Sequence, residues 1–190
     1  MTLPNQLTLL RLALTVVFVV CLTVEVPFGR TFAFLVFVLA TITDYLDGVL
    51  ARRLGQITDF GKLMDPLADK VLTASAFICL IPAVDFPAWA VIIIIAREFL
   101  ITGLRLLAGA KGVLLPAERL GKHKTAWQMI TILFYLLLLA AGDWPALFSE
   151  ELQQLGWTLI GPALIGITVL LTVYSGAAYL WKSRRLIDFR

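Results

Sequence analysis

The sequence predicts an all-α integral membrane protein built as a bundle of six transmembrane helices. Apolar residues make up 60% of the chain and the mean hydropathy is +0.91, values that exclude an ordinary soluble domain. A helix needs about 20 residues to cross a bilayer. Six apolar stretches of suitable length occur, at residues 6–25, 31–50, 63–83, 88–109, 125–141 and 158–181. One helical domain, residues 1–190, accounts for the whole chain.

The first span is expected to remain in the protein as a permanent helix. Residues 1–6 hold no basic side chain and no small-residue cleavage site follows the span, so no cleavable signal is predicted. Cys21 and Cys79 both fall within spans, where we expect small buried apolar residues and not a disulfide pair.

A polar stripe marks the start of the first span. Asn5, Thr8 and Arg11 follow one another at steps of three, so they share one face of an otherwise apolar helix. An Arg at this depth needs an anion, and its planar fork suits a phosphate or a carboxylate. We therefore expect this face to point into the bundle. Capping by Asn5 and snorkelling of Arg11 to the interface would also account for the stripe.

Four aspartates lie where the second span ends and the third begins, in the pattern D-x2-D-G-x2-A-R-x8-G-x3-D-x3-D; they are Asp44, Asp47, Asp65 and Asp69. The first two share one helix face, the last two share another, and residues 52–60 are long enough for a turn that makes the helices antiparallel. The carboxylates can then converge, and they would repel one another unless cations lay between them. All-oxygen sites suit Mg²⁺ or Mn²⁺, and two such ions would stabilise charge on a phosphate. Interfacial ion pairing would explain any one aspartate, but it is a poor explanation for four.

Small residues lie on the same acidic faces. Gly48, Ala51 and Gly61 leave clearance beside the carboxylates, so a flat or phosphorylated ligand can lie against bare backbone there.

The fourth span holds a second group of charges. Arg97 lies near mid-span, too deep to snorkel easily, so it needs an interior anion. Glu98, an aspartate of the motif or a substrate phosphate would each serve. Arg105 lies nearer the cytoplasmic end and is a better candidate for contact with a ligand. Lys122 and Lys124 follow in a basic loop before the fifth span, where the intervening His123 is expected to be interfacial.

The fifth and sixth spans are predicted to carry little chemistry, and the charges around all six spans indicate their orientation. Asp143, Glu150 and Glu151 are expected in an external loop. Gly161, Gly166 and Gly176 suit close helix packing, within or between subunits. Of 16 Lys and Arg residues, eleven fall in loops and tails on the side that holds both termini, whereas only Arg30 falls in an opposite loop. Both termini and the acidic motif are therefore expected to face the cytoplasm.

The acidic pattern resembles the signature of the CDP-alcohol phosphatidyltransferase family and matches it at every fixed position. The resemblance implies a six-helix membrane fold in which two divalent ions, Mg²⁺ or Mn²⁺, help an alcohol to displace CMP from a CDP-linked lipid. It assigns the metal ions to Asp44, Asp47, Asp65 and Asp69, and removal of the acceptor's proton to Asp69. It assigns the CDP group to Asn5, Thr8, Arg11, Gly48, Ala51, Arg52 and Gly61.

Three further strings are similar to the branch of the family that uses glycerol 3-phosphate: PN-x-LT-x2-R from Pro4, REFLITGLR from Arg97 and GKHKT from Gly121. They imply that CDP-diacylglycerol and glycerol 3-phosphate give phosphatidylglycerol phosphate and CMP. The acceptor phosphate would bind Arg97, Arg105, Lys122 and Lys124. The resemblance also implies a homodimer. Membrane lipids are expected partners, and no nucleic-acid partner is expected. The absence of a targeting extension favours a bacterial plasma membrane.

Two alternatives remain open at this point. The same scaffold would serve another acceptor, and an inositol phosphate ranks ahead of serine because the basic residues favour an acceptor that carries phosphate. A divalent-cation transporter would also gather carboxylates, but transporters often carry internal repeats. No second copy of the acidic motif is present.

Overall fold

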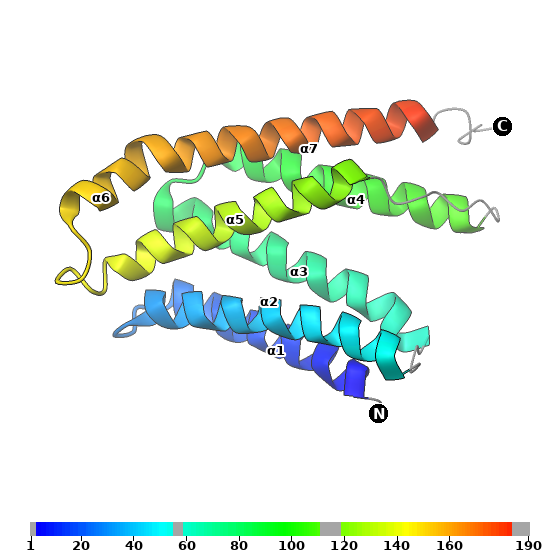
Figure 1. Cartoon of the computed structure of the whole chain (residues 1–190), viewed down its shortest axis with the longest axis horizontal. Helices are drawn as coiled ribbons and strands as arrows, with labels where there is room; N and C mark the ends of the chain where they lie inside the picture. Colours follow the sequence, from blue (N-terminus) through cyan, green and yellow to red (C-terminus); the bar gives the residue numbers. More distant parts are fainter. Residues whose placement is uncertain (1–2, 55–58, 111–118, 184–190) are drawn as a thin grey trace. The chain divides into compact units, whose positions relative to one another are not determined.

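The computed structural model describes residues 3–54, 59–110 and 119–183, and within these it contains helices and their connections and no strand. The helices are α1 (Leu3–Thr23), α2 (Gly29–Leu54), α3 (Asp59–Val84), α4 (Ala88–Ala110), α5 (Arg119–Ala141), α6 (Glu150–Leu155), the π-helical turn η1 (Gly156–Ile160) and α7 (Gly161–Ser183) (Figure 1). Each predicted span coincides with a long helix, which confirms the all-α fold class.

Two predicted boundaries were wrong. Helix α5 begins at Arg119, so Lys122, His123 and Lys124 lie on a helix and not in a loop. Helix α6 begins at Glu150 and continues through η1 into α7, so Glu150 and Glu151 form the first turn of a helix. Acidic residues in a first turn are favourable because they face the positive end of the helix dipole.

Among the residues that the structure describes, four helical segments are long and apolar enough to cross a membrane: Asn5–Thr23, Leu67–Val84, His123–Ala141 and Glu150–Lys182. They indicate an integral membrane protein. Large apolar side chains are exposed along α1, α4 and α7, for example Val16, Ile92 and Leu170, as expected of surfaces that face lipid. The predicted spans 31–50 and 88–109 coincide with α2 and α4. That these two also cross the membrane stays a prediction.

The described chain divides into two compact units. Unit 1 comprises residues 1–86 and 132–155, and unit 2 comprises residues 87–131 and 156–190. In unit 1, α1 packs against both α2 and α3, and the rings of Phe18 and Phe37 meet at 5.5 Å between α1 and α2. Phe86 packs against Phe77 and Tyr135, at 5.6 and 5.4 Å. Both cysteines are free, as predicted.

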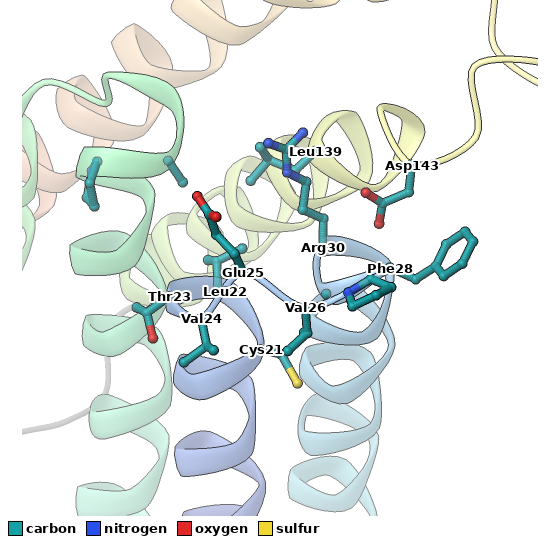
Figure 2. A pocket seen from close by; sticks show the side chains of 14 residues that line it. Cys21, Leu22, Thr23, Val24, Glu25, Val26, Phe28, Arg30, Leu139 and Asp143 are labelled. Carbon is teal, nitrogen blue, oxygen red and sulfur yellow. The ribbon is translucent and has the colours of Figure 1, made fainter.

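The α1–α2 loop leads into the N-terminus of α2, which is capped by a residue from a distant part of unit 1, Asp143 (Figure 2). Phe28 adopts a left-handed conformation with φ of 57°. A side chain at Gly29 would put its Cβ 2.8 Å from the Cys21 carbonyl oxygen, so this turn requires glycine. The Asp143 carboxylate accepts hydrogen bonds from the backbone N–H and the hydroxyl of Thr31, at 2.9 and 2.8 Å. Asp143 therefore caps the N-terminus of α2, as a local N-cap residue would.

We expect the Asp143→Ala variant to lose about 0.5–2 kcal/mol of stability because a first-turn N–H of α2 loses its acceptor. Thermal unfolding of the purified protein in detergent measures this loss. Glu25→Ala, which removes an exposed carboxylate from the α1–α2 loop, is the matched control and is expected to unfold like the native chain. Equal melting temperatures for Asp143→Ala and the native protein would show that the cap does not stabilise α2.

Unit 2 is built on α4 and α7, which pack together. Ile101 and Leu104 of α4 form a buried apolar cluster with Tyr179 of α7. The first half of α5 joins this unit through Thr131, whose hydroxyl lies 2.7 Å from the hydroxyl of Thr168 on α7.

Candidate functional site

The acidic motif lies on two consecutive helices of unit 1. Positions 44 and 47 fall in the second half of α2, and positions 65 and 69 fall near the start of α3. Both helices are continuous at these positions, and residues three or four positions apart correspond to one helix face; that the four carboxylates converge stays a prediction. Asp44 and Asp69 have described side chains, and both are partly exposed. The remaining predicted side chains of the motif, at Asp47, Gly48, Ala51, Arg52, Gly61 and Asp65, lie outside the described residues.

Arg11 and Asp44 form an ion pair between α1 and α2. The Arg11 Nη1 atom lies 2.7 Å from Asp44 Oδ1. The Arg11 side chain is almost completely buried, at 1% exposed, whereas that of Asp44 is 45% exposed. Arg11 therefore does not snorkel. The anion that Arg11 was predicted to require is the Asp44 carboxylate of the motif. This ion pair connects the polar stripe of α1 to the acidic part of α2.

The rest of the polar stripe is also buried. Thr8 has no exposed surface and Asn5 is 9% exposed. Thr15, one turn after Arg11, is also buried. Its hydroxyl donates a hydrogen bond to the Arg11 carbonyl oxygen at 2.8 Å. The expectation that this face points into the protein is therefore confirmed, whereas a role for Asn5 and Thr8 in binding a CDP group stays a prediction.

The donor set of the motif suits hard divalent cations. All four predicted ligands are carboxylates, and Arg11 contacts one of the two Asp44 oxygens, which leaves a second oxygen on that group. Mg²⁺ and Mn²⁺ prefer such oxygen donors. Among the described side chains, which do not include Asp47 and Asp65, no three Asp, Glu, His or Cys groups gather as metal ligands. The metal site therefore stays a prediction. The chemistry of the four carboxylates suits the Mg²⁺ or Mn²⁺ ions that are predicted there.

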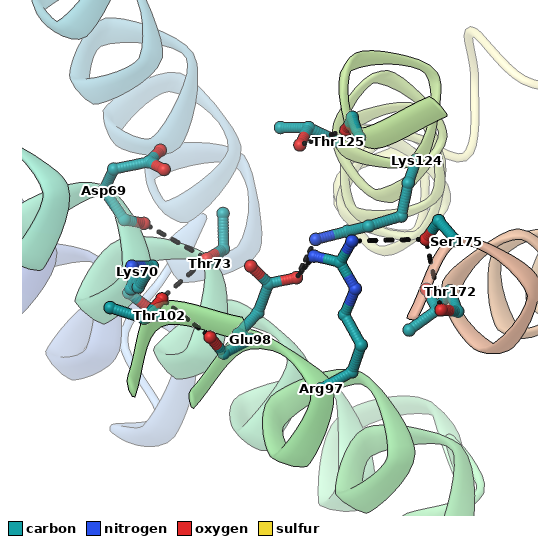
Figure 3. Close-up of polar contacts among 11 residues, drawn as sticks. Asp69, Lys70, Thr73, Arg97, Glu98, Thr102, Lys124, Thr125, Thr172 and Ser175 are labelled. Atoms are coloured by element: carbon teal, nitrogen blue, oxygen red, sulfur yellow. Dashed lines mark hydrogen bonds and ion pairs between the residues drawn. The ribbon is translucent and has the colours of Figure 1, made fainter. Parts of the chain in front are cut away.

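The predicted acceptor residues Arg97 and Lys124 meet in unit 2 at Glu98 (Figure 3). Lys124 Nζ contacts Glu98 Oε1, and Arg97 Nη1 lies 3.5 Å from the same oxygen. Arg97 Nη2 also donates to the Ser175 hydroxyl of α7 at 3.3 Å. The side chains of Lys124 and Arg97 are 2% and 14% exposed. Glu98, one of the anions considered as a partner for Arg97, therefore lies beside the Arg97 guanidinium in the structure.

The other two predicted acceptor residues differ in what the structure shows of them. Arg105 is exposed, lies two turns beyond Arg97 on α4, and donates through Nε to the Tyr179 hydroxyl at 3.2 Å. The side chain of Lys122 lies outside the described residues. His123 is exposed on α5, consistent with the expected interfacial position.

A cavity of about 680 Å³ is present in unit 1 (Figure 2), and no described residue of the acidic motif lines it. Its lining includes Glu25, Arg30 and Asp143, at the end of α2 opposite Asp44. At a rise of about 1.5 Å per residue, the length of α2 between positions 30 and 44 is roughly 20 Å. The cavity therefore does not hold the substrate that the motif is predicted to bind.

Comparison with known proteins identifies the family. The CDP-alcohol phosphatidyltransferase family model matches residues 1–174. The chain belongs to this family. A Bacillus subtilis protein named CDP-diacylglycerol–glycerol-3-phosphate 3-phosphatidyltransferase is 41% identical over 147 residues, 71% of this chain and 76% of its own. A Rickettsia bellii protein of the same name is 36% identical over 93% of this chain and 92% of its own. A probable phosphatidylglycerophosphate synthase of Mycobacterium tuberculosis is 37% identical over 96% of this chain and 82% of its own.

A set of six buried polar residues lies on α5 and α7 of this phosphatidyltransferase; the sequence had indicated Lys124, whereas the other five were missed. All are at most 3% exposed, and they are Lys124, Gln128 and Thr131 on α5 and Thr168, Thr172 and Ser175 on α7. On each helix they are spaced by four and then three residues, the spacing of a single helix face. The burial of these side chains does not test the expectation that these spans carry little chemistry, which stays a prediction. The spacing was visible in the sequence, but threonine and serine also satisfy themselves on their own helix backbone, so the pattern alone indicated no site.

Proposed function

We propose that this phosphatidyltransferase transfers the phosphatidyl group from CDP-diacylglycerol to sn-glycerol 3-phosphate, giving phosphatidylglycerol phosphate and CMP. The observation that carries this proposal is that three relatives, matching 71% to 96% of this chain, bear names for this activity. The match of the family model to residues 1–174 also supports treating residues 1–190 as one domain. The family match also argues against the alternative that this protein is a divalent-cation transporter.

The reaction proceeds by displacement at the phosphatidyl phosphorus. The acceptor hydroxyl oxygen forms a bond to this phosphorus, the bond from phosphorus to the CMP oxygen breaks, and CMP leaves with the electron pair. We assign the hydroxyl proton to the Asp69 carboxylate, since a positioned carboxylate acts as a general base. Asp44, Asp47, Asp65 and Asp69 would hold two divalent ions, Mg²⁺ or Mn²⁺. Bound ions of this kind offset charge on the pyrophosphate and the leaving nucleotide.

The CDP group is assigned to the buried stripe of α1 and to the small residues of the motif. Arg11 would orient the donor indirectly because it holds Asp44, and its guanidinium is also suited to phosphate. The acceptor phosphate is assigned to Arg97 and Lys124, with Arg105 and Lys122 contributing. An inositol phosphate would suit the same cations, so it is the second candidate acceptor.

The topology and assembly belong to the same proposal. We assign six spans, α1 to α5 and the continuous α6–η1–α7 segment, with both termini and the motif at the cytoplasmic face of a bacterial plasma membrane. The distribution of Lys and Arg supports this orientation. A homodimer is proposed from the family resemblance, and the mass of the protein in detergent tests it.

The direct test is an assay with purified protein, CDP-diacylglycerol and Mg²⁺ or Mn²⁺, in which CMP release and the lipid product are followed for several acceptors. We expect turnover with glycerol 3-phosphate, and not with serine, inositol phosphate or phosphatidylglycerol. A chelator should abolish turnover, and added Mg²⁺ or Mn²⁺ should restore it, because the four carboxylates need bound cations to converge. Turnover with inositol phosphate alone would overturn the acceptor assignment, and activity that survives chelation would overturn the metal assignment.

A further inference from the structure

Glu98 occupies a central position among the charges of unit 2, although neither the motif nor the acceptor assignment includes it. Its Oε1 atom contacts both Lys124 Nζ on α5 and Arg97 Nη1 on α4 (Figure 3). The Glu98 side chain is 22% exposed, so it is shielded from much of the solvent. One carboxylate oxygen is thus shared by the two cations that are assigned to the acceptor phosphate.

The charges explain why a carboxylate is needed between these two residues. Lys124 is nearly completely buried and lies close to the Arg97 guanidinium, so the two cations repel each other in surroundings of low dielectric constant. A buried ammonium without a counter-charge is strongly destabilised, and it would lose its proton or leave its position. Glu98 supplies the counter-charge and leaves the group of three with a net charge of +1.

The α7 helix fixes the other side of the Arg97 side chain. Ser175 accepts a hydrogen bond from Arg97 Nη2 and in turn donates to the Thr172 carbonyl oxygen at 3.2 Å. A Cβ atom at Gly176 would lie 3.0 Å from Arg97 Cγ, so glycine at this position allows the arginine to lie against α7. Arg97 is therefore held by Glu98 and by the Ser175–Gly176 segment.

We propose that Glu98 is a positioning residue of the acceptor site. It holds the Lys124 ammonium and the Arg97 guanidinium at the separation and in the charged state that a phosphate monoester requires. The inference rests on the proposed function, because it concerns how this enzyme binds glycerol 3-phosphate. Glu98 has no part in the chemical step, so its effect is expected on acceptor binding and not on use of CDP-diacylglycerol.

The test compares steady-state kinetics of Glu98→Gln, Glu98→Asp and the native protein, with each substrate varied in turn. For Glu98→Gln we expect the KM for glycerol 3-phosphate to rise about tenfold or more, because both cations lose the charge that orients them. The KM for CDP-diacylglycerol should be unchanged. Glu98→Asp keeps the charge on a shorter side chain and should recover part of the affinity. Glu151→Gln, at an exposed position on α6, is the control for loss of one negative charge.

Other outcomes would overturn the inference. If Glu98 only competes with the acceptor for the two cations, Glu98→Gln should lower the KM for glycerol 3-phosphate. If Glu98 serves stability alone, the variant should give less folded protein with unchanged KM values. A native protein that turns over glycerol 3-phosphate, with a Glu98→Gln variant that binds it equally well, would refute this inference and leave the proposed function intact. A native protein inactive with glycerol 3-phosphate would refute the proposed function itself.

A second pair of variants keeps the inference testable if Glu98→Gln does not fold. Gly176→Ala should displace Arg97 by a few tenths of an ångström and raise the KM for glycerol 3-phosphate, by less than Glu98→Gln does. Gly166→Ala is the matched control on the same helix, since no atom lies within 4 Å of its added Cβ. Equal KM values for these two variants would show that the position of Arg97 does not govern acceptor binding.

Discussion

The Asp69→Asn variant is expected to lose about 10²- to 10⁴-fold in kcat, the contribution typical of a positioned general base. Asparagine has nearly the same shape as aspartate but cannot accept the acceptor's proton. The measurement is the rate of CMP release at saturating CDP-diacylglycerol, glycerol 3-phosphate and Mg²⁺. Asp69 is also an assigned metal ligand, so a Mg²⁺ titration is needed to separate the two roles. A lost base lowers kcat at every Mg²⁺ concentration, whereas a weakened metal site is rescued by more Mg²⁺.

Asp85→Asn is the matched control for this variant. Asp85 is exposed in the α3–α4 connection with φ of 52°, a conformation that asparagine adopts readily. The control should retain the native rate. If Asp69→Asn kept a rate within tenfold of the native value, Asp69 would not be the base.

The second large effect is expected for Arg11→Met, which removes the buried cation of the Arg11–Asp44 pair and keeps much of the side-chain volume. A hydrogen bond to a charged group contributes about 1.5–3 kcal/mol, which corresponds to roughly a ten- to 150-fold loss in kcat/KM for CDP-diacylglycerol. The physical reason is that Asp44 loses the contact that fixes its carboxylate next to the stripe of α1. Arg11→Lys should be intermediate because it keeps the charge but not the planar fork.

Thr15→Val serves as the control for Arg11→Met. Thr15 is buried one turn from Arg11 on the same helix, and its hydroxyl is satisfied by the Arg11 carbonyl oxygen. It should alter kcat/KM by much less than tenfold. A near-native value for Arg11→Met would show that the ion pair is not required for donor binding.

Helix positions and the motif were predictable from the chain alone because they depend on local properties. Long apolar stretches must be helical in a bilayer, since every backbone polar group has to be satisfied internally. Residues three or four positions apart, such as Asp44 and Asp47 or Asp65 and Asp69, share one face of any helix. The helix ends were less predictable: α5 extends back to Arg119 and α6 begins at Glu150, because polar residues at the membrane surface continue a helix as readily as they end it.

The choice of partner for each charge was decided only by tertiary packing. The sequence indicated that Arg11 and Arg97 need anions but left several available for each. Packing of α1 on α2 selects Asp44 for Arg11, and packing within unit 2 selects Glu98 for both Arg97 and Lys124. The same holds for Asp143, which caps α2 from beyond the end of α5. An ion pair depends on distance and burial, and for residues on different helices neither is a property of the local sequence.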